Sequence, residues 1–96
     1  MNIQQTLNSM LKQHKEISKN LNTLEDLQMK CKTILGNDKD KKNFNKLLKQ
    51  TKKTYFVLNN SYKMIARDKT TKPKEFLEIG IEIEEMGKTL ESFKEF

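Results

Sequence analysis

Few residues of this 96-residue chain have the type and spacing that catalysis or metal binding requires. His14 is the only histidine and Cys31 the only cysteine. Both fall in one predicted helix, where their separation corresponds to roughly 25 Å along the axis. Each occupies a position among apolar residues, so we interpret both as side chains of the helix core. Glutamates of the last predicted helix have the chemistry of acid and base, but we expect no polar group to converge on them. We therefore predict no enzyme activity, no metal and no cofactor.

A stripe of lysines is the strongest candidate for a binding surface. Its members follow a 4, 3, 4 spacing and are Lys42, Lys46, Lys49 and Lys53. The same stretch carries a second stripe, typical of a helix face in a bundle core: Phe44, Leu48, Thr51, Tyr55, Leu58, Tyr62 and Ile65. Each lysine lies two residues from a member of the second stripe. Two residues correspond to about 200° of helical turn, so the two stripes point in nearly opposite directions.

Charge is distributed unevenly along the chain, whose formal net charge is +6. Residues 39–74 carry a net charge of +10, whereas residues 75–96 carry −5. In the last predicted helix, Glu78, Glu82 and Glu85 follow one another at spacings of four and three residues, and we expect all three to point away from the core. A basic face favours acidic partners, and a second copy of this chain offers such a face.

Nucleic acid is the alternative partner for the same lysines. Arg67 is the only arginine, although arginine makes the forked contacts that phosphates and bases favour. Aromatic residues and lysines lie on opposite faces, whereas single-strand binding needs them interleaved. The alternative is therefore a sequence-nonspecific contact with the backbone. The eighteen lysines and nine asparagines also match the codon bias of an A+T-rich genome, which leaves a nonfunctional origin of the stripe open.

Three helices must position these residues, at about 3–35, 40–67 and 74–94. The residues Gly36, Asn37 and Asp38 are typical of a helix stop and restart. A polar stretch that ends in Pro73 separates the second helix from the third. Residues 77–83 alternate as in a strand, but the flanking residues favour helix. We predict an all-α fold, an elongated antiparallel three-helix bundle that forms a single domain over residues 1–96.

Periodicity also predicts the core. The first helix contributes a broad apolar stripe made of Ile3, Leu7, Met10, Leu11, His14, Ile17, Leu21, Leu24, Leu27, Gln28, Cys31, Ile34 and Leu35. The third contributes Phe76, Ile79, Ile83, Met86, Leu90 and Phe93. Gly80 and Gly87 flank this last stripe and predict close approach of the first helix or of a partner.

Four apolar residues lie off the predicted stripes: Phe56, Val57, Leu77 and Ile81. We expect them to widen the core. If they are exposed instead, they form an apolar patch, which would mark an interaction site.

These observations favour a non-enzymatic helical protein–protein interaction module, of the adaptor, assembly-subunit, chaperone or inhibitor type. It is expected to dock an acidic partner or a second copy through the basic face of the helix over 40–67. The predicted partner-binding residues are Lys42, Lys46, Lys49, Lys53, Phe56, Val57, Leu77, Ile81, Glu78, Glu82 and Glu85. The sequence shows no signal peptide and no transmembrane run, and its single cysteine suits a reducing compartment. We therefore expect a cytoplasmic protein.

Overall fold

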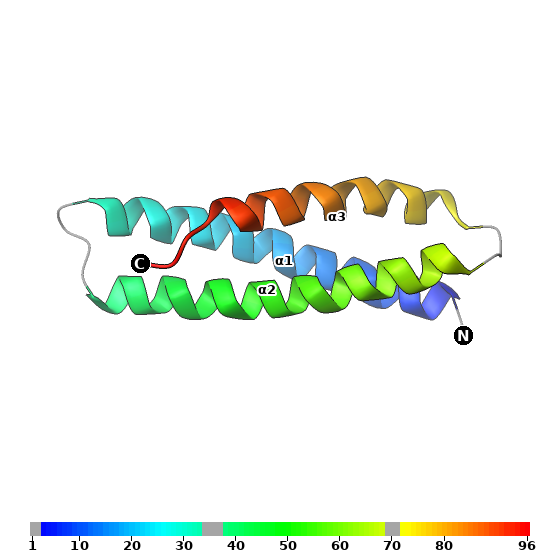
Figure 1. The fold of residues 1–96 in the computed structure, drawn as a ribbon, viewed down its shortest axis with the longest axis horizontal. Helices are drawn as coiled ribbons and strands as arrows, with labels where there is room; N and C mark the ends of the chain where they lie inside the picture. The colour runs from blue at the N-terminus through cyan, green and yellow to red at the C-terminus, as the bar shows by residue number, and fades with distance from the viewer. Residues whose placement is uncertain (1–2, 34–37, 69–71) are drawn as a thin grey trace.

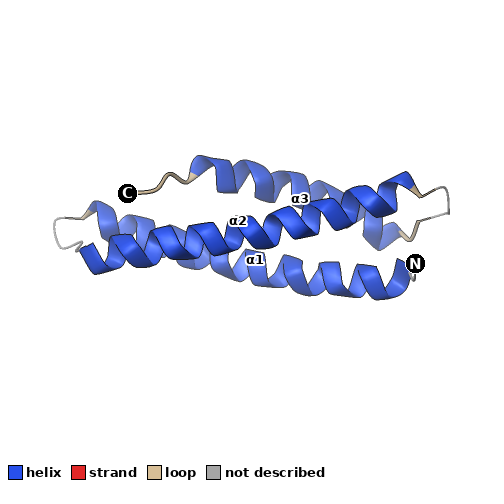
Figure 2. Cartoon of the chain, turned by 60° about the horizontal axis from the view of Figure 1, so that its bottom comes forward, coloured by secondary structure: helices blue, strands red, loops and turns tan. Residues whose placement is uncertain are grey.

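A computed structural model, which describes residues 3–33, 38–68 and 72–96, confirms the predicted all-α bundle of three helices. Helix α1 spans Ile3–Lys32, α2 spans Asp38–Arg67 and α3 spans Lys74–Ser92. Successive helices run antiparallel (Figure 1) and form a rod with extents of 53 × 18 × 16 Å. Helices α1 and α2 pack along most of their length, and the shorter α3 contacts both of them (Figure 2).

The helix ends differ from the predicted bounds by a few residues. The prediction carried the first helix to residue 35, but α1 ends at Lys32, and the Thr33 N–H and hydroxyl both donate to the Lys30 carbonyl. Residues 34–35 and the predicted stop at Gly36 lie outside the described residues. Helix α2 begins at Asp38 rather than residue 40, and acidic side chains suit this positive end of the helix dipole. Helix α3 ends at Ser92 rather than residue 94 because Phe93 takes up extended backbone, with φ −83° and ψ 133°.

Most of the predicted core positions among the described residues are buried or half-buried. The side chains buried between the helices are Leu7, Met10, Ile17, Leu24, Cys31, Phe44, Leu48, Thr51, Leu58, Ile65, Phe76, Ile79, Ile83, Met86, Leu90 and Phe93. Thr51 is the polar member of this set, and its hydroxyl donates to the Leu47 carbonyl at 2.7 Å, which satisfies the buried group. The strand pattern over residues 77–83 is helical in the structure, as predicted.

One residue that was predicted to belong to the core stripe of α1 is exposed in the structure. Leu11 is 38% exposed and does not join the core, contrary to the prediction, because it lies beyond the seam towards the outer side of α1. Cys31 is buried as a free thiol, and His14 is half-buried, as expected of core positions. The predicted core positions 34 and 35 lie outside the described residues.

Two tyrosines of α2 fit against two glycines of α3. An added Cβ at Gly80 would lie 2.5 Å from the Tyr62 hydroxyl oxygen and 2.8 Å from two of its ring carbons. A Cβ at Gly87 would collide with the Tyr55 hydroxyl. The sequence-based expectation that the first helix or a partner approaches these glycines was therefore wrong, since the neighbours are rings from α2. Both pairs are spaced by seven residues, so the rings set the register of α3 on α2.

Candidate interaction surface

The four lysines at 42, 46, 49 and 53, which we call the lysine face, are exposed on the outer side of α2. Phe44 and Leu48 of the same helix are buried, so the two stripes face opposite directions as predicted. Lys49 lies 3.9 Å from a Glu95 carboxylate oxygen. Within the described part of the chain, the other three lysines form no ion pair. The bundle therefore makes little use of this charge.

Four off-seam apolar residues are exposed and do not widen the core, which overturns the expectation. Phe56 and Ile81 are each 65% exposed, and Val57 and Leu77 are exposed to a similar degree. The physical reason is that each helix of a three-helix bundle has two neighbours. A side chain that points more than about 100° from the seam meets no further helix and remains in water.

The outer side of α2 thus carries exposed apolar side chains as well as exposed basic ones in its second half. Phe56 follows Lys49 by two helical turns and Val57 follows Lys53 by one, so both continue the lysine face. Met64, also exposed, follows Val57 by two turns on the same side. Sequence reasoning missed Met64, although its seven-residue spacing from Val57 was the signal that could have found it.

The predicted acidic residues of α3 are exposed, but they are not equivalent. Glu82 pairs with the His14 Nε2 of α1 at 2.8 Å, and Glu78 lies 3.9 Å from the Lys74 ammonium one turn away. Glu85 forms no ion pair with the described residues. Exposed pairs of this kind contribute about 0–1 kcal/mol each, so Glu78 remains available to a partner.

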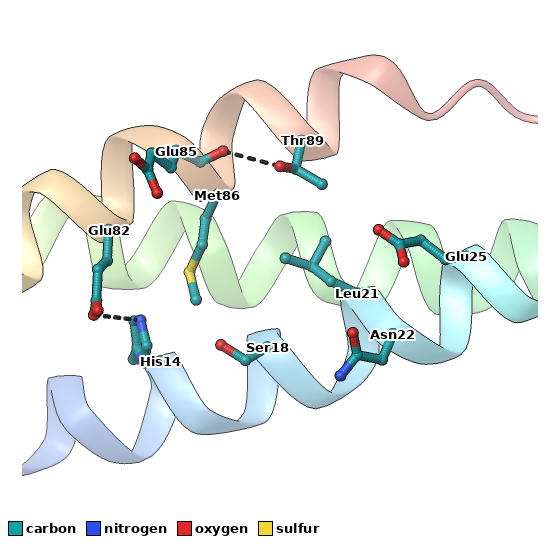
Figure 3. A pocket seen from close by; sticks show the side chains of 9 residues that line it. All are labelled: His14, Ser18, Leu21, Asn22, Glu25, Glu82, Glu85, Met86 and Thr89. Atoms are coloured by element: carbon teal, nitrogen blue, oxygen red, sulfur yellow. Dashed lines mark hydrogen bonds and ion pairs between the residues drawn. The ribbon is translucent and has the colours of Figure 1, made fainter.

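An open groove of about 370 Å³ lies between α1 and α3 (Figure 3). It is lined by His14, Ser18, Leu21, Asn22, Glu25, Glu82, Glu85, Met86 and Thr89. Polar side chains of α1 therefore share a groove with two glutamates of α3, and one of them, His14, contacts Glu82, contrary to the expectation from sequence. The parallel course of α1 and α3, which periodicity does not reveal, brings them together.

Among the described residues that line this groove, one ion pair joins α1 to α3, between His14 and Glu82. No hydrogen bond joins the Ser18 hydroxyl to His14 among them, so no nucleophile is paired with a base. The same part of the chain contains no group of three His, Cys, Asp or Glu side chains placed to hold a metal ion. We assign the His14–Glu82 pair the role of joining α1 to α3.

The tyrosines face inward rather than towards the lysines. The Tyr62 ring stacks on Phe76 with centroids 4.7 Å apart. Burial raises the pKa of the Tyr55 hydroxyl, and the nearby Glu91 and Glu84 carboxylates raise it further. Both rings thus pack in the contact between α2 and α3.

None of the helices in the described part of the chain is long and apolar enough to span a bilayer. Comparisons with protein-family models, with curated proteins and with solved structures found no match for this chain.

Proposed function

We propose that this chain is a non-enzymatic interaction module that binds an acidic protein partner through the outer side of α2. The observation that carries the proposal is the composition of this surface. Lysines and large apolar side chains share one helix face, and the bundle needs neither for its core. Exposed apolar groups beside unpaired charge are typical of surfaces that another protein covers.

Charge and shape together favour a protein over a nucleic acid. Phosphate binding uses the lysines but leaves Phe56, Val57 and Met64 in water. The two tyrosines are packed against α3 and are not available for stacking on bases. An acidic protein surface that also offers apolar side chains fits both the lysines and the apolar residues of this face, and the Glu78–Glu85 face of a second copy has suitable charge. Cys31, buried as a free thiol, supports the proposal of a cytoplasmic location.

Charge reversal tests the proposal. A variant with Lys42→Glu, Lys46→Glu and Lys53→Glu is compared with the wild type for capture of binding proteins from the native host. The matched control reverses three exposed lysines of α1, at positions 12, 15 and 19. Both variants change the net charge equally, and circular dichroism checks that both remain helical.

The proposal requires that the wild type and the α1 control capture the same acidic protein, and that the α2 variant binds it at least about tenfold more weakly. Equal capture by all three proteins would overturn it. A shift of labelled duplex by the wild type at low salt, lost in the α2 variant, would replace it with backbone binding of nucleic acid. Concentration-dependent sedimentation lost only in the α2 variant would identify a second copy as the partner.

A further inference from the structure

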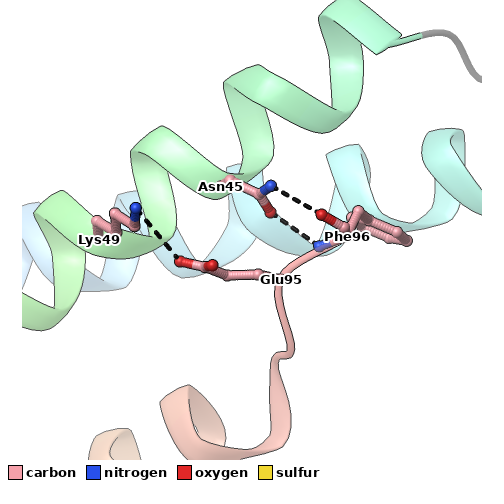
Figure 4. Close-up of polar contacts among 4 residues, drawn as sticks. All are labelled: Asn45, Lys49, Glu95 and Phe96. Atoms are coloured by element: carbon pink, nitrogen blue, oxygen red, sulfur yellow. Dashed lines mark hydrogen bonds and ion pairs between the residues drawn. The ribbon is translucent and has the colours of Figure 1, made fainter.

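Residues 93–96 cover a part of α2 that α3 does not reach. Helix α3 ends at Ser92, while the last turns of α1 and the first turns of α2 extend beyond that end (Figure 1). The four residues, which we call the 93–96 segment, leave α3 and lie against the first half of α2 (Figure 4). Phe93 fills the core beside Phe44 and Leu48, and the remaining three residues are exposed.

Asn45 of α2 binds the backbone of this segment in two places. The Phe96 N–H donates to the Asn45 Oδ1 at 2.9 Å, and the Asn45 Nδ2 donates to the Phe96 carbonyl at 3.1 Å (Figure 4). A side-chain amide presents a donor and an acceptor side by side, as a neighbouring strand does. Asn45 therefore recognises the extended backbone at position 96, and this contact does not depend on the side chain at that position.

The residues beside Asn45 recognise side chains of the segment. The Phe44 ring meets Phe93 and Phe96 edge-on, with centroids 6.0 and 5.1 Å apart. Lys49, one turn after Asn45 on the same side, lies 3.9 Å from the Glu95 carboxylate. One stretch of α2 thus provides an aromatic ring, an amide that hydrogen-bonds to the backbone, and a cation.

We propose that Phe44, Asn45 and Lys49 form a binding site for an extended peptide in which an acidic residue precedes an aromatic one. Glu95 and Phe96 occupy this site within the chain and must be displaced by a partner. The inference rests on the proposed function, because Lys49 belongs to the lysine face, and it specifies that the acidic partner presents an extended segment there.

The contacts of residues 94–96 are of a kind that a competing peptide can replace. Phe96 is 46% exposed, whereas Phe93 is only 5% exposed. Among the described residues, 94–96 form no backbone–backbone hydrogen bond with the bundle. Phe93 therefore holds the segment in place, while Glu95 and Phe96 can leave the site and be replaced by a competing peptide. An internal occupant at high effective concentration weakens binding of any free peptide.

The test uses a fluorescent peptide with the sequence of residues 92–96, Ser-Phe-Lys-Glu-Phe, blocked at both ends so that its glutamate is the only carboxylate. Its anisotropy is measured with the full chain and with Phe96→Ala, which weakens the internal occupant. Asn45→Ala is then added to Phe96→Ala. Asn43→Ala in the same background is the matched control, because Asn43 is exposed on the same helix.

We expect Phe96→Ala to bind the peptide about tenfold more tightly than the wild type, as for a site occupied internally about nine-tenths of the time. Asn45→Ala should remove about tenfold of this affinity, and Asn43→Ala none. Equal binding by the wild type and Phe96→Ala, or equal weakening by the two asparagine variants, would overturn the inference. The Lys42, Lys46 and Lys53 reversals leave the peptide site intact, so the proposed function and this inference can fail separately.

Discussion

The two halves of α2 are covered in different ways. Its C-terminal half lies under α3, where Tyr55 and Tyr62 fit against glycines that leave room for nothing larger. Its N-terminal half lies under the extended 93–96 segment, which binds through Asn45 and Lys49. The first contact depends on shape and burial, and the second on polar groups that water can replace.

This difference separates a contact that maintains the fold from one suited to exchange. Steric fit between rings and glycines is lost only when α3 moves as a unit. Hydrogen bonds and ion pairs between exposed groups contribute about 1 kcal/mol or less each, and a competitor offers the same groups. Variants of the tyrosine–glycine contacts and variants of the 93–96 segment should therefore differ in how much they lower stability. They should also differ in which second substitution restores it.

The largest expected difference in stability is between two variants of the 93–96 segment. Phe93→Ala should lower the free energy of unfolding by about 3 kcal/mol, because it removes a buried ring and leaves a cavity. Phe96→Ala should lower it by about 1 kcal/mol, the value of an exposed edge-on ring contact. Urea unfolding followed by circular dichroism measures both. Phe56→Ala, on an exposed ring of α2, is the control and should stay within about 0.5 kcal/mol of the wild type. Equal losses at positions 93 and 96 would remove the distinction between anchor and exchangeable part.

The tyrosine–glycine contacts give the next largest effect. Alanine at Gly80 or Gly87 gains about 1 kcal/mol of helix propensity but forces a ring to move, at a cost of about 1–3 kcal/mol. We expect net destabilisation in both cases, by about 1 kcal/mol. Tyr55→Phe should restore Gly87→Ala, because it removes the hydroxyl and leaves the nearest ring carbon at 3.0 Å. Tyr62→Phe should not restore Gly80→Ala, because ring carbons remain 2.8 Å from the new Cβ. Equal rescue at both sites in thermal unfolding would argue against this steric account.

The smallest expected effect is a dependence of stability on alkaline pH. It arises from Tyr55, in the half of α2 that α3 covers. Burial, followed by Glu91 and Glu84, raises the pKa of Tyr55 above its ordinary value of 10.0. The unfolded chain therefore loses this proton at lower pH than the folded chain does. The stabilisation is fully present below pH 10 and is lost as pH rises towards the folded-state pKa. Urea unfolding between pH 8 and pH 11 should show a shallower decline for Tyr55→Phe than for the wild type. Parallel declines would mean that ionisation of Tyr55 does not contribute.

Periodicity in the sequence was sufficient for the three helices and for most of the core. Apolar residues at alternating spacings of three and four define one face of a helix, whatever lies opposite. Ile17, Leu58 and Ile83 were predicted on this basis and all are buried. The same argument placed the lysine face opposite the core of α2, because the direction of a side chain from a helix depends only on its position in the turn.

Contacts between helices were decided by the tertiary structure. The glycines were noticed in the sequence, but their tyrosine partners depend on the side of α2 along which α3 packs. The pairing of His14 with Glu82 and of Asn45 with Phe96 joins residues 68 and 51 positions apart, which no local pattern encodes. The sequence by itself determined which face of each helix is apolar and which is charged. Only the packing of three faces around one axis determined which side chains meet, because their distances depend on all three helices together.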